Sequence, residues 1–156
     1  MITYVGQNLG ARQHRRVRQG VRAALVIALI TSVVIAAVML ALGRVILGWF
    51  ISGTPQEVAL TTDIAYLYLA IMSVALPVLY LLHVLRSAVQ GMGNTALPMV
   101  SGVVEFVMRT VTALCLPLAG QVGIFLAEPA AWLGADVVLV LSYLLVSRRV
   151  LSSGSA

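Results

Sequence analysis

Two opposite charges, Glu105 and Arg109, lie near the middle of an apolar run over residues 98–117. A charge at the centre of a membrane-crossing helix costs about 2.5–3.5 kcal/mol even on a lenient insertion scale. Such charges persist when they are paired or when they face water. The acid precedes the base by four residues, which is the favourable order for an ion pair within one helix. We therefore expect Glu105 and Arg109 to pair.

Three further polar or aromatic side chains recur at every fourth position of the next apolar run: Glu128, Trp132 and Asp136. This spacing places them on one helical face. With a rise of 1.5 Å per residue, Arg109 lies about 10 Å from the end of its helix and Glu128 about 9 Å from the start of the next. Because the two are level and a guanidinium presents five donors, we expect Arg109 to bridge Glu105 and Glu128. Asp136 lies deeper, where we expect a wet cavity or a partner helix.

The network of Glu105, Arg109 and Glu128 has two interpretations. It is either a structural clamp that locks two helices together, or a site where one carboxylate exchanges protons or binds a cation and so drives movement of the helices. An arginine at this distance should keep the acids ionised, which favours the clamp. Replacing Arg109 by alanine separates the two interpretations, because loss of folded protein supports the clamp and loss of transport alone supports coupling.

The composition predicts an integral membrane protein. Of the 156 residues, 61% are hydrophobic and 10% are charged, and the mean hydropathy is +1.04. All ten basic residues are arginines, and five of them fall within residues 12–22. This cluster has no interleaved aromatic residues and adjoins a long apolar run, so we expect it to meet lipid phosphates and not nucleic acid.

The sequence shows no sign of an enzyme. It has no nucleophile with a neighbouring base, no spacing typical of metal ligands and no phosphate-binding loop. The single cysteine, Cys115, lies in an apolar segment, so we expect it to pack and not to form a disulfide or a metal site. We expect no cofactor.

Four segments are long and apolar enough to cross a bilayer, which requires about 20 residues each. They are residues 23–43, 64–85, 96–116 and 122–146, separated by SGTPQE at 52–57, by QGMGNT at 90–95, and by Pro117 with Gly120 and Gly123. The connections are short, so neighbouring helices should be antiparallel. We expect an all-α bundle over residues 23–148, preceded by a helix tail and basic loop (1–22) and followed by a short tail (149–156). A cleaved signal peptide is a less favoured interpretation of the first segment, because three further spans follow it.

The placement of arginine predicts the orientation. Five arginines precede the first span, one follows the second and two follow the fourth, which gives eight on one side against Arg44 alone on the other. Basic loops stay cytoplasmic, so both termini should be cytoplasmic in a multi-pass protein of the inner cell membrane.

Rows of small residues should let helices approach closely. One row recurs every four residues in the first span, and a partner helix should lie against it: Gly20, Ala24, Ala28, Ser32 and Ala36. The fourth span has a similar row in Ala127, Ala131 and Ala135. Pro77 and Pro129 remove backbone donors, so each should kink or locally open its helix.

Three stretches together resemble the carboxyl-terminal lobe of multidrug and toxic compound extrusion (MATE) transporters. TYVGQNLGARQHRRVRQGVR resembles the cytoplasmic segment after the lobe's second helix, where a Gln-Asn-x-Gly-Ala motif precedes a basic loop; here the motif and loop supply Gln7, Asn8, Gly10 and Arg16. LRSAVQGMGNTALPMVSGVVEFVMR is similar to the next loop and helix, and GIFLAEPAAWLGADVVL to the last helix of a bacterial branch. The stretches follow family order along nearly the whole chain.

The resemblance implies an antiporter that expels cationic or amphipathic organic compounds in exchange for protons or sodium. The family is built from two six-helix lobes, and residues 23–146 would form helices nine to twelve. The amino-terminal lobe and the first part of this lobe would then be missing, so we expect the chain to need them, or another chain, for transport. Some branches hold an acid in helix ten, where this sequence offers only His83. We expect His83 to be an interface residue near the cytoplasmic end and a less favoured proton carrier. Trp132, Asp136 and His83 are candidates to face a cavity or the substrate.

Two alternatives to a MATE-type antiporter stay open. Four spans with membrane acids could form a small exporter that acts as a dimer, although such exporters carry their acid in the first helix, which here has none. The chain could also be a membrane scaffold or subunit that transports nothing.

Overall fold

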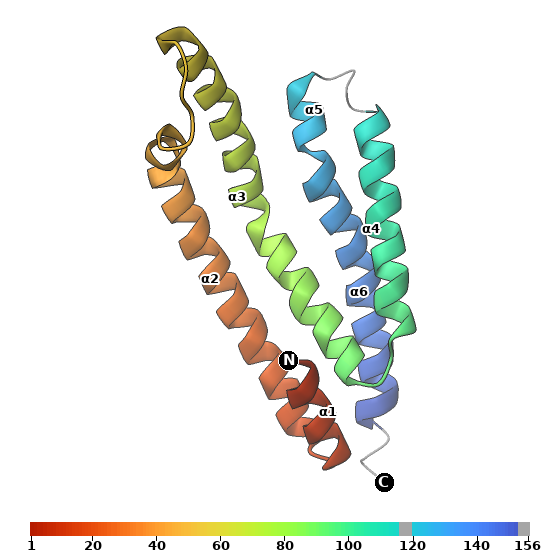
Figure 1. Ribbon diagram of the computed structural model, residues 1–156. Helices are drawn as coiled ribbons and strands as arrows, with labels where there is room; N and C mark the ends of the chain where they lie inside the picture. The colour runs from red at the N-terminus through yellow and green to blue at the C-terminus, as the bar shows by residue number, and fades with distance from the viewer. Residues whose placement is uncertain (116–119, 153–156) are drawn as a thin grey trace.

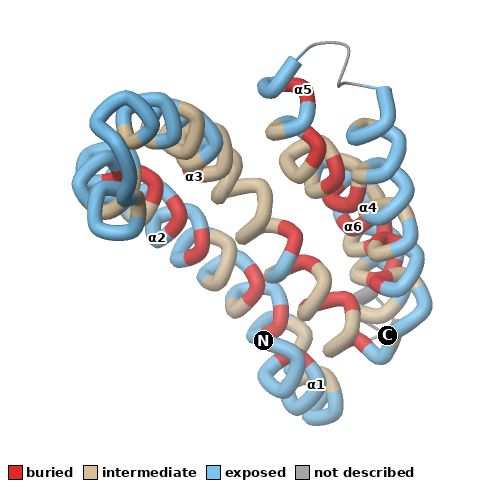
Figure 2. The backbone as a smooth tube through the Cα atoms, turned by 45° about the horizontal axis from the view of Figure 1, so that its top comes forward, coloured by how far each residue is buried: buried red, intermediate tan, exposed pale blue. Residues whose placement is uncertain are grey.

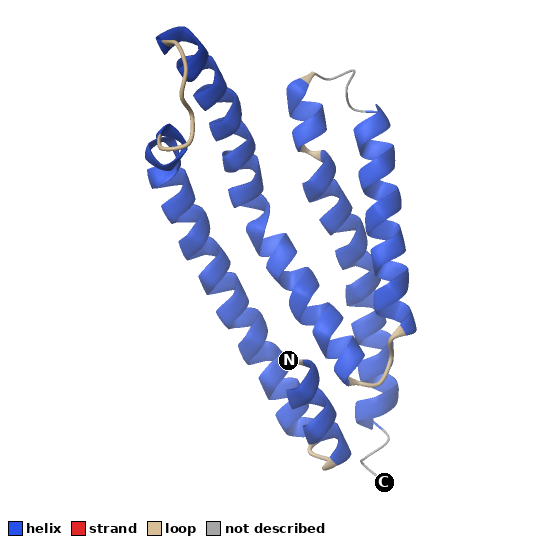
Figure 3. Ribbon diagram, in the orientation of Figure 1, coloured by secondary structure: helices blue, strands red, loops and turns tan. Residues whose placement is uncertain are grey.

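The structure, a computed structural model, describes residues 1–115 and 120–152, and over these residues it is helical, with no strand (Figure 3). The helices are α1 (Ile2–Gly10), α2 (His14–Gly48), α3 (Pro55–Gly91), α4 (Ala96–Cys115), α5 (Gln121–Phe125) and α6 (Ala127–Ser152). Three of them, together with the α5–α6 segment, are long and apolar enough to cross a membrane. The all-α membrane bundle expected from the sequence is therefore confirmed.

The helices form two neighbouring antiparallel pairs, α2 with α3 and α4 with α6, and α3 also packs against α6 (Figure 1). The short helix α1 packs against α2 and α3 at one end of the bundle. The start of the chain and the end of α6 lie at this end (Figure 1), which we call the terminal end.

Two helices extend well beyond the apolar segments that predicted them. Helix α2 begins at His14, so most of the basic stretch expected as a loop forms its first turns. These turns are held because Val17 and Val21, one turn apart, are buried in a core cluster. Helix α3 begins at Pro55 and ends at Gly91. Its start is fixed by a capping box, in which the Glu57 carboxylate accepts the Thr54 backbone N–H at 3.0 Å.

Small residues line the contacts between helices, as the sequence predicted. Ala28, Ser32 and Ala36 of α2 are buried, as are Ala127, Ala131 and Ala135 of α6. Buried positions follow the inward sides of the long helices, whereas the outward sides are exposed (Figure 2). Exposed apolar side chains on those outward sides are what a lipid-facing helix presents.

The prolines act on the two helices in different ways. Pro77 lies inside α3, where it leaves a carbonyl one turn earlier without its usual donor. Pro129 lies in the first turn of α6, and the helix break at Leu126 separates α5 from α6. Because Pro129 has no N–H to bond the Phe125 carbonyl, it accounts for this break. The local opening expected at Pro129 is therefore present, while Pro117 and Leu116 lie outside the described residues.

Candidate functional site

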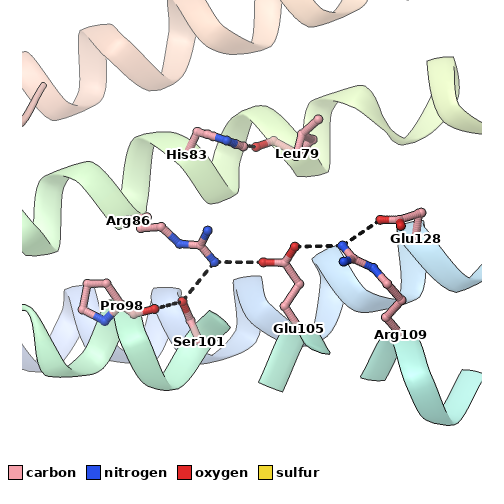
Figure 4. Close-up of polar contacts among 8 residues, drawn as sticks. All are labelled: Leu79, His83, Arg86, Pro98, Ser101, Glu105, Arg109 and Glu128. Atoms are coloured by element: carbon pink, nitrogen blue, oxygen red, sulfur yellow. Dashed lines mark hydrogen bonds and ion pairs between the residues drawn. The ribbon is translucent and has the colours of Figure 1, made fainter. Parts of the chain in front are cut away.

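Four charged side chains from three helices form a continuous chain of ion pairs, which we call the charge chain: Arg86, Glu105, Arg109 and Glu128 (Figure 4). Arg109 donates to Glu105 Oε1 at 3.1 Å and to Glu128 Oε2 at 2.8 Å. The other oxygen of Glu105 accepts from Arg86 at 2.9 Å. The bridge between Glu105 and Glu128 that the sequence predicted is present, and Arg86 extends it to α3.

Each member of the charge chain is positioned by its helix. Glu105 and Arg109 lie one turn apart on α4 and point toward the facing helices (Figure 4). Glu128 lies in the first turn of α6, directly after the break at Leu126. A carboxylate is favoured there by the positive end of the helix dipole. The chain of ion pairs therefore joins α3, α4 and α6.

Arg86 has a second acceptor in α4. It donates to Ser101 Oγ at 3.3 Å, and Ser101 in turn donates to the Pro98 carbonyl at 2.7 Å (Figure 4). Ser101 is fully buried. This arrangement fixes the guanidinium against the first turns of α4 and directs it toward Glu105.

The charge chain is partly shielded and electrically balanced. The Glu105 side chain is 19% exposed and the Arg109 side chain is 41% exposed, and the four residues carry two positive and two negative charges. The Nε atoms of Arg86 and Arg109 are buried without a hydrogen-bond partner among the described residues. A balanced and linked set of charges can be tolerated within an apolar bundle where a single charge cannot.

Asp136 is a buried acid that does not belong to the charge chain. It is 6% exposed, and neither carboxylate oxygen has a hydrogen-bond partner within the described part of the chain. Its neighbour Ala135 belongs to a core cluster with Leu82, Leu85 and Leu139. Leu85, the chain neighbour of Arg86, belongs to this cluster, so the part of α3 that carries Arg86 packs against α6 near Asp136. Asp136 is therefore buried within the helix bundle.

The other candidates for a cavity are placed differently. Trp132 packs against the Leu82–Leu139 cluster. His83 is exposed and lines a pocket of about 370 Å³ with Leu79 and Tyr80. Its Nδ1 lies 2.8 Å from the Leu79 carbonyl oxygen (Figure 4). The structure thus leaves His83 outside the charge chain.

The Gln-Asn-x-Gly-Ala motif forms the end of α1 and its turn into α2. Asn8 donates from Nδ2 to the Tyr4 carbonyl at 2.8 Å, and the Tyr4 hydroxyl donates to the Arg16 carbonyl at 3.1 Å. Gln7 and Gly10 are exposed, and the Gln7 carbonyl accepts the Ala11 N–H at 3.0 Å. The Tyr4–Arg16 hydrogen bond joins α1 to α2, and the other two hydrogen bonds lie within α1 and its carboxyl-terminal turn.

Sequence reasoning assigned Arg86 only a topological role, although it belongs to the charge chain. The positions of Arg86 and Glu105 along their helices could have indicated this contact. Arg86 lies five residues before the end of α3 at Gly91, and Glu105 lies nine residues after the start of α4 at Ala96. At 1.5 Å per residue their depths differ by about 6 Å, which the length of an arginine side chain can span. Among the described residues, no group of three or more His, Cys, Asp or Glu could hold a metal.

Comparison with known proteins identifies one relationship. The MatE family model matches residues 1–115 of the chain, which is more than half of it. The match covers α1–α4 and so includes Arg86, Glu105 and Arg109, whereas Glu128 and Asp136 lie beyond it. No curated protein and no solved structure matches the chain.

Proposed function

This chain belongs to the MatE family of multidrug and toxic compound efflux transporters, and we propose that it forms part of an antiporter. The proposed activity is export of cationic or amphipathic organic compounds in exchange for protons or sodium. The chain is a multi-pass membrane protein, and we place it in the inner cell membrane with both termini cytoplasmic. The family consists of transporters and not of enzymes.

The observation that supports coupling is that Arg86, which pairs with Glu105 at 2.9 Å, lies on the part of α3 that packs against α6 around Asp136: Leu85 and Ala135, the chain neighbours of Arg86 and Asp136, belong to one core cluster. Neither carboxylate oxygen of Asp136 has a hydrogen-bond partner in the described residues. An unpartnered carboxylate in apolar surroundings is least costly when it holds a proton. When the proton leaves, the new negative charge attracts Arg86 and competes with Glu105 for it.

Competition for Arg86 would act on the packing of the bundle. The ion pair between Arg86 and Glu105 joins α3 to α4, and Asp136 lies on α6. Movement of the guanidinium toward Asp136 would weaken the α3–α4 link and strengthen the α3–α6 link. Release and uptake of one proton would thereby shift α3 relative to α4. This is the kind of two-state element that alternating access requires.

The proposed coupling is tested by measuring a distance as a function of pH. In a Cys115→Ser background, spin labels at His83→Cys on α3 and Val103→Cys on α4 occupy exposed sites. The label at position 83 also removes the neighbouring titratable histidine. In lipid nanodiscs we expect the label-to-label distance to change with pH, and Asp136→Asn to abolish the change.

The matched control is Asp63→Asn, which neutralises an acid in the exposed Arg44–Asp63 pair. This variant should keep the pH response. A response that survives in Asp136→Asn would contradict the assignment of Asp136 as the proton-exchanging group.

Transport itself also needs a second body against which the bundle moves. We propose that further helices, from an amino-terminal lobe or another chain, supply it. The chain alone, reconstituted in vesicles with a fluorescent organic cation and a proton or sodium gradient, should show no gradient-dependent efflux. Efflux by the isolated chain would instead support a small exporter that works as a dimer.

A non-transporting scaffold is the second candidate function. It is favoured by the charge chain, in which both Glu105 oxygens are engaged and three helices are tied together. A scaffold requires that the label-to-label distance stay constant across pH. The same spin-label experiment therefore decides between the two functions.

A further inference from the structure

A cavity of about 530 Å³ between α2 and α6 is lined by three arginines, and we call it the basic pocket. Arg18 and Arg22 reach it from α2 and Arg148 from α6, together with the hydroxyl-bearing Tyr143 and Ser147. No acidic residue is among its lining residues. It lies toward the terminal end, since α2 begins and α6 ends there (Figure 1).

Arg22 is the least engaged of the three arginines that line the basic pocket. Arg22 is exposed and forms no hydrogen bond or ion pair with the described residues. Arg18 and Arg22 both act electrostatically on the Tyr143 hydroxyl. Arg18 and Arg148 also have interactions of their own within the chain, so Arg22 is the side chain best placed to bind an outside anion. Three guanidinium groups beside a low-dielectric region attract an anion strongly.

The donors of the pocket suit a phosphate group. Guanidinium groups bind phosphate oxygens through two parallel hydrogen bonds. Tyr143 also lines the cavity, whereas the Ser147 hydroxyl already donates to the Leu144 carbonyl at 3.3 Å, so the arginines are the donors for a phosphate. A phosphate in this pocket would find charged donors on two sides, from α2 and from α6.

An apolar groove lies next to the basic pocket, and it favours a lipid over a free phosphate. The groove has a volume of about 350 Å³ and shares Leu25 with the basic pocket. From Leu25 it runs between α2 and α3, along Ala28, Leu29, Pro77, Val78 and Leu81. The polar area of this groove is small and its walls are aliphatic. A charged site beside an aliphatic groove matches a phosphate headgroup with an attached acyl chain.

We infer that the basic pocket and the adjoining groove bind one anionic phospholipid, with its phosphate among Arg18, Arg22 and Arg148 and an acyl chain along the groove past Leu25. Basic pockets between membrane helices at the cytoplasmic side are suited to such headgroups. The bound lipid would bridge α2 and α6, two helices that otherwise meet mainly at the terminal end. This site is independent of the charge chain and of the proposed transport activity.

The test compares three additives on the purified full chain in a neutral detergent. Phosphatidylglycerol, phosphatidylcholine and inorganic phosphate are each titrated while the thermal unfolding midpoint is recorded. We expect phosphatidylglycerol to raise the midpoint and the other two to leave it unchanged. An equal rise of the midpoint with phosphatidylcholine would contradict the requirement for an anionic headgroup. An equal rise with inorganic phosphate would contradict the inference that the ligand is a lipid.

Single substitutions then test whether the lipid binds at the basic pocket. Arg22→Gln should weaken the apparent affinity for phosphatidylglycerol about fivefold, the effect expected of one arginine beside an anionic lipid. Arg22→Lys keeps the charge and should retain most of the affinity. Arg15→Gln is the matched control, because Arg15 is an exposed arginine of the same α2 end that does not line the pocket. Equal losses in Arg15→Gln and Arg22→Gln would overturn the site. If Arg22→Gln does not fold, the comparison of the three additives on the unaltered chain still decides.

Discussion

Replacing Arg109 by alanine is the sharpest perturbation of the charge chain. The substitution removes the ion pairs to Glu105 at 3.1 Å and to Glu128 at 2.8 Å. Glu105 keeps Arg86 as a partner at 2.9 Å. Glu128 has no other ion pair among the described residues, so its carboxylate would be left unpaired beside the bundle. The main cost of the substitution therefore falls on Glu128.

The size of that cost follows from the exposure of the groups. Removing one partner of a fully buried ion pair costs about 3–5 kcal/mol, whereas exposed pairs contribute about 0.2–1 kcal/mol. The Arg109 and Glu128 side chains are 41% and 34% exposed, which places this pair between the two limits. We expect Arg109→Ala to lower the free energy of unfolding by about 2 kcal/mol.

A double-mutant cycle isolates the interaction. Glu128→Gln removes the charge but keeps an oxygen that can accept from Arg109, so we expect a loss of about 1 kcal/mol. The double variant has no unpaired carboxylate, and its loss should fall short of the sum by about 1 kcal/mol. The measurement is reversible unfolding in mixed micelles, followed by circular dichroism. Arg44→Ala serves as the control, because its pair with Asp63 is 60% and 64% exposed.

The result also separates the clamp from coupling. A coupling energy below about 0.5 kcal/mol, the usual scatter for independent sites, would refute an energetic link between Arg109 and Glu128. A large coupling energy supports a clamp between α4 and α6. If Arg109→Ala instead folds normally and the pH-dependent α3–α4 distance is lost, the network serves coupling more than stability.

Two further substitutions test local features of the fold. A Cβ atom at Gly91 would lie 2.8 Å from the Ile2 carbonyl oxygen, so Gly91→Ala should displace α1 and lower the free energy of unfolding by about 1–3 kcal/mol. Proteolysis within residues 1–10 should become faster. An unchanged rate of proteolysis would contradict this packing of α1 against α3. Thr54→Ala removes the capping box at the start of α3 and should cost about 1 kcal/mol. Amide exchange should accelerate in the first turn of α3 and stay the same in α6, and uniform acceleration would show that the cap is not local.

The membrane-crossing segments were predictable because hydropathy depends on composition over about 20 residues. The bridge from Arg109 to Glu128 was also predictable, since helical rise and antiparallel connection fix the depth of each residue. The residues at which the helices begin and end were not predictable from the sequence. Helix α2 begins at His14 because Val17 and Val21 find partners on other helices, and no local pattern states which distant side chains will bury them.

Arg86 was missed for a related reason. Counting arginines by side treats each one as a marker of orientation, and Arg86 follows the last apolar residues predicted for its span. In the structure α3 continues to Gly91, so Arg86 lies within the helix and reaches Glu105. Asp136 was recognised as a membrane acid, but its lack of a hydrogen-bond partner depends on how α6 is rotated against α3 and α4. That rotation is set by the packing of Ala131, Ala135 and Leu139.

The balance of charge is the reason why we propose Asp136, and not a member of the charge chain, as the cation-exchanging group. The described charge chain is neutral, with Arg86 and Arg109 against Glu105 and Glu128, so an ionised Asp136 adds one uncompensated negative charge to an apolar region. A proton, a sodium ion and an organic monocation each carry the single positive charge that would restore neutrality. If two of these compete for the same carboxylate, binding of one must weaken binding of the other by the same free energy in both directions. Under the proposed coupling, exchange of one cation for another would require no further device at this site than a single buried acid on α6 that packs beside the part of α3 carrying Arg86.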